Sequence, residues 1–306
     1  MGWWAGRSGA RADGHPHGYG KPLPRRGRRG YDDRVPPADR DVIDFRGERG
    51  RHQRFVGREG ELAAIDACLV GPGAARGWVL VTGQPGMGKS ALLSRWLDLA
   101  EKAGRPAAHH FLRRGVADWD RPEAIARSLA AQIERLYPAQ ADAEATPAQR
   151  LLDLLGRVSR EVLVPRGERL VLVADGLDEA AAEPGQNPLP LFLPYALPEG
   201  VMALCGSRPT YPHLGWLEGR DGFLLRVDLD AAEHSGSNDA VCRSLWRAWE
   251  PAFQPSLPAG FVDRALAAGA GNVLYAVKLC EWSRAQPAAS RRVSKLPQGR
   301  TAGCSA

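Results

Sequence analysis

The strongest chemical signal in the chain is a run of nine residues: Gly83, Gln84, Pro85, Gly86, Met87, Gly88, Lys89, Ser90 and Ala91. Its first eight residues fit the pattern G-x-x-x-x-G-K-S of a phosphate-binding loop. The glycines let backbone N–H groups approach phosphate oxygens with no side chain in the way. Lys89 is expected to bridge the β- and γ-phosphates, and the Ser90 hydroxyl to hold Mg²⁺. The run therefore predicts a site for ATP or ADP with magnesium.

The segments on either side of this phosphate-binding loop suit that role. The apolar run 78–82 precedes it and is typical of a buried strand, while 90–103 carries leucines and a tryptophan at helical spacing. A helix that begins at the loop directs the positive end of its dipole toward a bound anion. The loop is thus expected at the carboxyl end of a strand, where such ligands bind.

Three acidic residues follow a second apolar run, 170–174. Asp175 ends that run, so its carboxylate is expected at the carboxyl edge of the sheet, on a strand neighbouring the loop, where it can hold the magnesium. Glu179 is the preferred candidate for orienting the attacking water, and Asp178 is the alternative. The other interpretation of this segment is a solvated acidic turn.

A cation follows the next predicted strand. Arg208 comes directly after the apolar run 201–206 and is expected across the site from the phosphate-binding loop. There it could contact the γ-phosphate and stabilise its developing charge. The alternative is a surface arginine in a loop.

Strands and helices alternate along most of the chain, which predicts an α/β fold with a doubly wound, mainly parallel five-stranded sheet. After residue 231 only helices are expected, forming a small C-terminal helical subdomain over 231–285 behind an α/β domain over 55–230. The strands are expected at 78–82, 107–112, 170–174, 201–206 and 223–227, and the helices at 59–70, 90–103, 122–137, 146–162, 238–249, 261–268 and 272–282.

Charge is distributed unevenly over the 306 residues. The leader, residues 1–54, has 13 Lys and Arg against 7 Asp and Glu, which accounts for the whole net charge of +6. Rich in Gly, Pro and Arg, it is expected to be a disordered basic segment, as is the tail 286–306. A solvated tail is favoured over contact with nucleic acid. A misassigned start, with residues 1–40 not native, is a further interpretation.

Other functional classes find little support. No apolar stretch is long enough to cross a bilayer and the N-terminus lacks a signal-peptide core, so a cytoplasmic location without membrane contact is expected. The five cysteines lack metal-ligand spacing. His109 and His110 are adjacent in a strand and should point to opposite faces, which disfavours a shared metal ion.

Five motifs occur in an order that resembles the STAND class of P-loop ATPases, close to its NACHT and AAA-type members: 55–59 (FVGRE), the phosphate-binding loop, 175–179 (DGLDE), 207–209 (SRP) and 271–275 (GNVLY). The resemblance covers about 55–282 and implies a P-loop NTPase fold. It also implies that Val56 and Arg58 line the pocket for the adenine base. The paired Asp178 and Glu179 are closer to NACHT than to NB-ARC proteins.

Members of that class continue into a winged-helix domain and a repeat array, neither of which is recognisable here. The leading hypothesis is a slow, Mg²⁺-dependent ATPase switch module of a STAND or NACHT-type signalling regulator, with self-association through the ATPase domain as one expected partner interaction. The alternatives are an AAA-type DNA-associated ATPase that uses the basic leader, or an inactive nucleotide-binding fragment. A small-molecule kinase would need a basic lid, and none is recognisable near the site.

Overall fold

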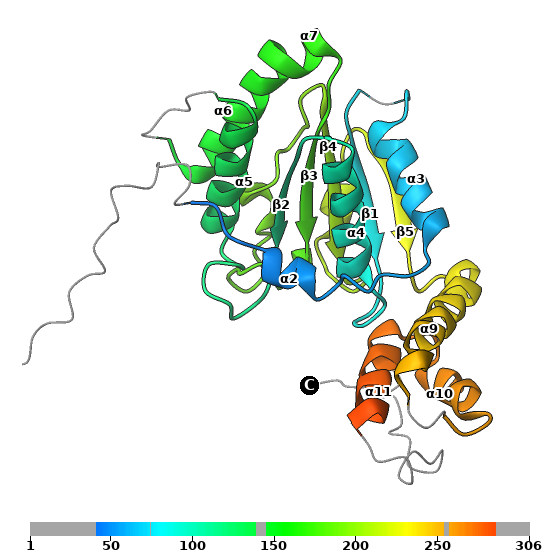
Figure 1. The fold of residues 1–306 in the computed structure, drawn as a ribbon. Helices are drawn as coiled ribbons and strands as arrows, with labels where there is room; N and C mark the ends of the chain where they lie inside the picture. The colour runs from blue at the N-terminus through cyan, green and yellow to red at the C-terminus, as the bar shows by residue number, and fades with distance from the viewer. Residues whose placement is uncertain (1–40, 74, 139–144, 254–256, 286–306) are drawn as a thin grey trace, which may run out of the picture. The chain divides into compact units, whose positions relative to one another are not determined.

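The computed structural model describes residues 41–73, 75–138, 145–253 and 257–285, all within one compact unit. Five strands form one sheet in the order β2-β3-β4-β1-β5, and every neighbouring pair is parallel (Figure 1). The strands are β1 (Gly77–Thr82), β2 (Ala107–Phe111), β3 (Leu170–Asp175), β4 (Val201–Ser207) and β5 (Phe223–Asp228). The predicted five-stranded α/β fold is confirmed, and it is the P-loop NTPase fold.

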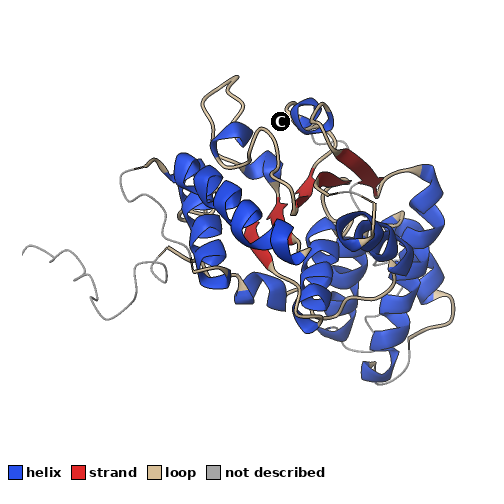
Figure 2. Ribbon diagram, turned by 90° about the horizontal axis from the view of Figure 1, so that it is seen from above, coloured by secondary structure: helices blue, strands red, loops and turns tan. Residues whose placement is uncertain are grey.

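The two faces of the sheet bury different side chains because neighbouring residues of a strand point in opposite directions. Val79 and Val81 of β1 join the cluster that holds α3 (Glu59–Val70) and α4 (Lys89–Lys102). Trp78 and Leu80 join the cluster that holds α5 (Pro122–Leu136) and α6 (Pro147–Val158). Seen from above, the strands pass between helices on both sides (Figure 2). The sheet is therefore doubly wound.

Shorter elements complete this part of the chain. The helix α6 continues through a π-helical turn (Ser159–Leu163) into α7 (Val164–Arg166), and α8 (Leu214–Glu218) lies between β4 and β5. Three further helices, α9 (Ser235–Trp249), α10 (Phe261–Gly269) and α11 (Val273–Ala285), surround a cluster of their own that includes Trp246 and Phe261. We call these three the C-terminal helices. Among the described residues, no helix is long and apolar enough to cross a membrane.

Part of the predicted leader has defined structure. Residues 41–54 contain α2 (Arg46–Gly50), and Phe45 is only 2% exposed. The Phe45 ring packs edge-on against His110 and Trp119, with ring centroids 4.9 and 4.8 Å away. The expectation of disorder up to residue 54 is therefore wrong for 41–54. The segment is polar and basic, and the one aromatic residue that anchors it, Phe45, gave no recognisable pattern. The rest of the leader and the tail 286–306 lie outside the described residues.

Candidate functional site

A cavity of about 1030 Å³ opens at the carboxyl edge of the sheet. Its walls come from the phosphate-binding loop, the ends of β2, β3 and β4, the segment 48–58 and the C-terminal helices α9 and α11. The predicted site residues that line it are Val56, Arg58, Pro85, Gly86, Gly88, Lys89, Ser90, Ala91, Asp175, Asp178, Glu179 and Arg208. Residues separated by more than 200 positions thus face one space of a size suited to a nucleotide.

The phosphate-binding loop is held in shape by its own groups. Lys89 Nζ donates to the carbonyls of Gly83 and Gln84, at 2.6 and 3.3 Å, and Met87 N donates to Gln84 O at 3.2 Å. Gly83, Gln84 and Met87 do not line the cavity, and the Met87 side chain is buried in the sheet core. Burial lowers the pKa of Lys89, while the charges of Asp175 and Asp178 raise it. A buried ammonium group among carboxylates is a ready partner for phosphate oxygens.

Asp175 reaches the loop across an intervening strand. The prediction of a neighbouring strand was wrong, since β4 lies between β1 and β3 and hydrogen-bonds to both. Gly206 of β4 has no side chain, and a Cβ there would stand 2.3 Å from Asp175 Oδ1. Gly206 leaves the space that the Asp175 carboxylate occupies, and the nearby Ser90 hydroxyl lowers the pKa of this carboxyl. The expected convergence of this carboxylate with the phosphate-binding loop is thus present in the structure.

The Asp175 carboxylate provides a test of whether magnesium fits. Its residue is 5% exposed, and Oδ1 has no hydrogen-bond partner. Burial raises the pKa of Asp175, while Ser90 and Lys89 lower it. A free oxygen on a buried carboxylate, next to a hydroxyl, is a donor set that suits Mg²⁺ when phosphates and water complete it. The residues therefore fit the ion, and Ser90 and Asp175 are the ones that would hold it.

Asp178 binds Arg208 with both of its carboxylate oxygens. Oδ1 accepts from the Arg208 amide at 3.0 Å, and Oδ2 lies 2.9 Å from Arg208 Nε. Arg208 follows β4, which is directly beside β1, and it lines the same cavity as the phosphate-binding loop. Its charge acts on Lys89, whose pKa it lowers. Asp178 therefore positions a cation in the cavity.

Glu179 has a different environment from its neighbour. Its Oε2 accepts from the Arg114 amide at 3.0 Å, and Arg114 Nη2 donates to the carbonyl of Asp178 at 3.1 Å. Gly176, in the left-handed region at φ 82°, turns the chain from β3 into the 3₁₀ turn Leu177–Glu179. Glu179 is half-buried and forms no ion pair with any described residue, which leaves its carboxylate better suited than Asp178 to accept a proton from water.

Arg58 lines the cavity with a side chain that is bound to other groups of the protein. It is 4% exposed, and its guanidinium donates to Met87 O at 2.9 Å, Asn238 Oδ1 at 2.6 Å and Glu61 Oε1 at 3.1 Å. The side chain is therefore committed to the protein, although it borders the cavity. Val56 packs against the cluster of the C-terminal helices and lines the cavity beside them.

Several cavity residues escaped the sequence analysis. His52 and Arg113 both approach the buried carboxylate of Glu48, with Arg113 Nη2 2.5 Å and His52 Nε2 3.7 Å from Oε1. They come from the segment assigned to the leader and from the loop after β2, where no motif marks them. Asn272 also contacts the loop, and here a signal existed, because an Asn before an apolar helix is a common N-cap.

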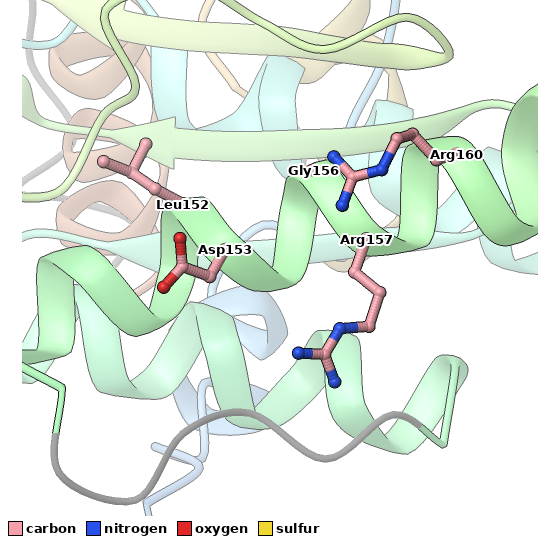
Figure 3. A pocket seen from close by; sticks show the side chains of 5 residues that line it. All are labelled: Leu152, Asp153, Gly156, Arg157 and Arg160. Carbon is pink, nitrogen blue, oxygen red and sulfur yellow. The ribbon is translucent and has the colours of Figure 1, made fainter.

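A second hollow lies on the surface of α6 and the π-helical turn after it. Leu152, Asp153, Gly156, Arg157 and Arg160 line it (Figure 3). All five belong to one continuous helical segment, and none is a predicted site residue. Among the described residues, no group of three or more His, Cys, Asp and Glu could hold a metal ion.

Comparison with known proteins found one matching family and similar solved structures. Residues 54–194 match the family described as AAA ATPase domain. No curated protein matches. A solved structure described as a DNA replication initiation factor is similar with a TM-score of 0.41 and 16% identity, over 76% of this chain and 63% of that one, so less than two thirds of its length is covered. The segment 54–194 is thus similar to an AAA-type ATPase domain.

Proposed function

We propose that this protein binds Mg·ATP in the cavity between the phosphate-binding loop and the C-terminal helices, and that it hydrolyses ATP slowly as the switch module of a STAND or NACHT-type signalling regulator. The observation that carries the proposal is the single cavity in which Lys89, Asp175, Glu179 and Arg208 meet residues of α9 and α11. A ligand in that space touches both parts of the chain, so its presence biases their packing.

The side chains suggest a division of labour in hydrolysis. Glu179 accepts a proton from a water molecule while the oxygen of that water bonds to the γ-phosphorus. The bond between the γ-phosphorus and the β–γ bridging oxygen breaks and leaves ADP. Lys89 and Arg208 stabilise negative charge on the phosphate oxygens. Magnesium, when bound at Ser90 and Asp175, neutralises phosphate charge.

Slow turnover by the isolated chain agrees with how three of the cavity arginines are engaged. Arg208 pairs with Asp178, Arg58 with Glu61 and Arg113 with Glu48. Moving any of them to the γ-phosphate would break an ion pair. An arginine from a second copy, brought by self-association, would supply the missing charge and accelerate hydrolysis.

The DNA-associated alternative receives less support from the described part of the leader. Arg46 pairs with Asp44, and Arg51 with Glu48. Arg49 pairs with Asp98 and Glu101 of α4. These cations neutralise carboxylates of the same chain, which reduces what they can offer to a phosphate backbone. That alternative therefore depends on residues 1–40, outside the described ranges.

The test is binding of a fluorescent ATP analogue to the wild-type chain and to Lys89→Ala. We expect the dissociation constant to rise about 10- to 100-fold in Lys89→Ala, the usual effect of losing a charge-assisted hydrogen bond. Lys102→Ala, an exposed lysine at the end of the same helix, serves as the control. Equal affinity in Lys89→Ala and wild type would rule out the proposed site.

Two further measurements separate the remaining alternatives. Phosphate release by the wild-type chain distinguishes a slow ATPase from a fragment that binds nucleotide without turnover. Binding to duplex DNA at low and high salt tests the alternative that uses the leader, because phosphate contacts weaken steeply with salt. Salt-sensitive DNA binding that disappears when residues 1–40 are deleted would favour the DNA-associated ATPase.

A further inference from the structure

Three consecutive carbonyls of the phosphate-binding loop receive hydrogen bonds from outside the loop. Asn272 Nδ2 donates to Pro85 O at 3.0 Å, and the Leu274 amide donates to Gly86 O at 2.9 Å. The third carbonyl, that of Met87, accepts from Arg58 at 2.9 Å. The first two donors belong to the start of α11. The third donor, Arg58, also hydrogen-bonds to Asn238 of α9. We call these three hydrogen bonds the carbonyl clamp.

Arg58 transmits the clamp to α9 through buried groups. Its Nη2 atom donates both to Met87 O and to Asn238 Oδ1, and Asn238 is 4% exposed. The Asn238 amide in turn donates to the carbonyl of Leu229, just after β5. Because each of these polar groups would be costly to bury without a partner, the set is expected to form and break together.

The clamp acts on the groups that face a phosphate. In a planar trans peptide, the carbonyl of one residue and the N–H of the next point in opposite directions. Fixing the carbonyls of residues 85–87 therefore fixes the directions of the N–H groups of residues 86–88. The Met87 N–H already donates to Gln84 O, so those of Gly86 and Gly88, which line the cavity, are the ones available to a phosphate. Gly86 has a φ of 87°, and a Cβ there would stand 2.5 Å from Asn272 Oδ1, so the loop approaches Asn272 too closely for a side chain at position 86.

We propose that the C-terminal helices align the amides of the phosphate-binding loop through the carbonyl clamp, with Asn272 as its main positioning residue. The inference rests on the proposed function, since the loop must bind nucleotide for the alignment to matter. Coupling of this kind is reciprocal: if docked helices strengthen polyphosphate binding, then bound polyphosphate strengthens docking of the helices by the same factor. Bound nucleotide would thus affect the docking of α9 and α11 through the carbonyls of residues 85–87.

Asn272 has a second, structural role that the experiment must set aside. Its Oδ1 accepts from the Tyr275 amide at 2.9 Å and caps α11. Asn272→Ser keeps a capping oxygen but is too short to donate to Pro85 O. Asn187→Ser is the matched control, because Asn187 Oδ1 likewise accepts from the amide of Leu189, in an element that does not line the cavity.

In the full chain, we expect Asn272→Ser to raise the dissociation constant for Mg·ATP about tenfold, the factor that corresponds to about one lost hydrogen bond. Hydrogen exchange should show that ATP protects the amides of α9 and α11 in wild type and in Asn187→Ser, and much less in Asn272→Ser. Arg58→Lys, which keeps a charge beside Glu61 but cannot reach Met87 O and Asn238 together, carries the same expectation if Asn272→Ser fails to fold.

Wild-type ATP affinity together with wild-type protection in Asn272→Ser would overturn the inference. The proposed function would stand in that case, provided that Lys89→Ala had lost affinity. If the wild-type chain bound no ATP, both the inference and the proposed function would fall.

Discussion

The carboxylate of Asp175 lies over Gly206, in space that any side chain at position 206 would fill. The two residues are register partners on β3 and β4, and a Cβ at 206 would approach Leu93 Cδ2 at 3.2 Å as well as the carboxylate at 2.3 Å. The central strand of the sheet thus lacks a side chain at the one place where an acidic group passes over it toward Ser90.

Gly206→Ala should therefore displace the Asp175 carboxylate without removing it. We expect Mg²⁺-dependent ATP affinity to fall about tenfold or more, while binding measured in the presence of a chelator changes little, because Lys89 and the loop amides remain. Titration with fluorescent ATP, with and without magnesium, measures both. Gly215→Ala, where a Cβ has no neighbour within 4 Å, is the control. Unchanged magnesium dependence in Gly206→Ala would contradict this role for Asp175.

The rate constant of hydrolysis should show whether Glu179 or Asp178 is the general base. Glu179→Gln is expected to bind ATP with wild-type affinity and to lower the hydrolysis rate constant by about 100-fold or more, since removal of a general base costs a factor of that order. Glu183→Gln, at an exposed position four residues further on, should leave the rate unchanged. Single-turnover phosphate release is the measurement, and a wild-type rate in Glu179→Gln would return the role of base to Asp178.

We expect Phe45 to anchor the segment 41–54 to β2 and the loop that follows it. Phe45→Ala removes a ring packed against His109, His110, Phe111 and Trp119. We expect the free energy of unfolding to fall by about 3 kcal/mol, at the lower end for a buried Phe truncated to Ala. Arg46→Ala, with 91% of its side chain exposed, should change stability little. Denaturant unfolding followed by tryptophan fluorescence gives both values, and equal stability of the two variants would show that the anchor is dispensable.

Buried histidines should make the fold sensitive to acid. Burial lowers the pKa values of His109 and His110 to about 4, from 6.5 in an unfolded chain. Above pH 6.5 both states hold neutral imidazoles, whereas below it the unfolded state takes up protons first. Stability is therefore lost as the pH falls from about 6.5 to about 4, by up to roughly 3 kcal/mol for His110.

The His110 contribution can be isolated by substitution. Carboxylates titrate in the same range, so the quantity to compare is the loss of unfolding free energy between pH 7 and pH 4.5 in each variant. His110→Gln keeps an amide that can donate to Trp119 O, the present partner of Nε2 at 3.0 Å, and should show a smaller loss than wild type. Identical losses in His110→Gln and wild type would mean that this histidine is not held neutral.

The sequence predicted the elements well because their signals are local. The predicted helix 59–70 matches α3 at both ends, and the strand predicted at 170–174 differs from β3 only by Asp175. Apolar spacing and the position of prolines report on neighbours along the chain, which is what defines such elements. The α/β class followed from their alternation.

Strand order and side-chain partners could not be obtained in this way. Both β3 and β4 are buried on both faces of the sheet, so nothing in 170–174 or 201–206 indicates which strand lies beside β1. Arg58 illustrates the same limit: the family resemblance implied that it lines the base pocket, whereas its three acceptors come from residues 61, 87 and 238 and are visible only in the folded chain. Phe45 was missed because one aromatic residue carries no periodicity.

The carbonyl clamp also has a consequence for biosynthesis. The ribosome makes residues 83–90 almost 200 positions before it makes Asn272 and Leu274, the donors that hold Pro85 O and Gly86 O. In a nascent chain that has completed all five strands, the phosphate-binding loop therefore still lacks these two hydrogen bonds. Tight binding of nucleotide is expected only after α11 has emerged, so the loop cannot act as a switch before the helices that contact it have been made.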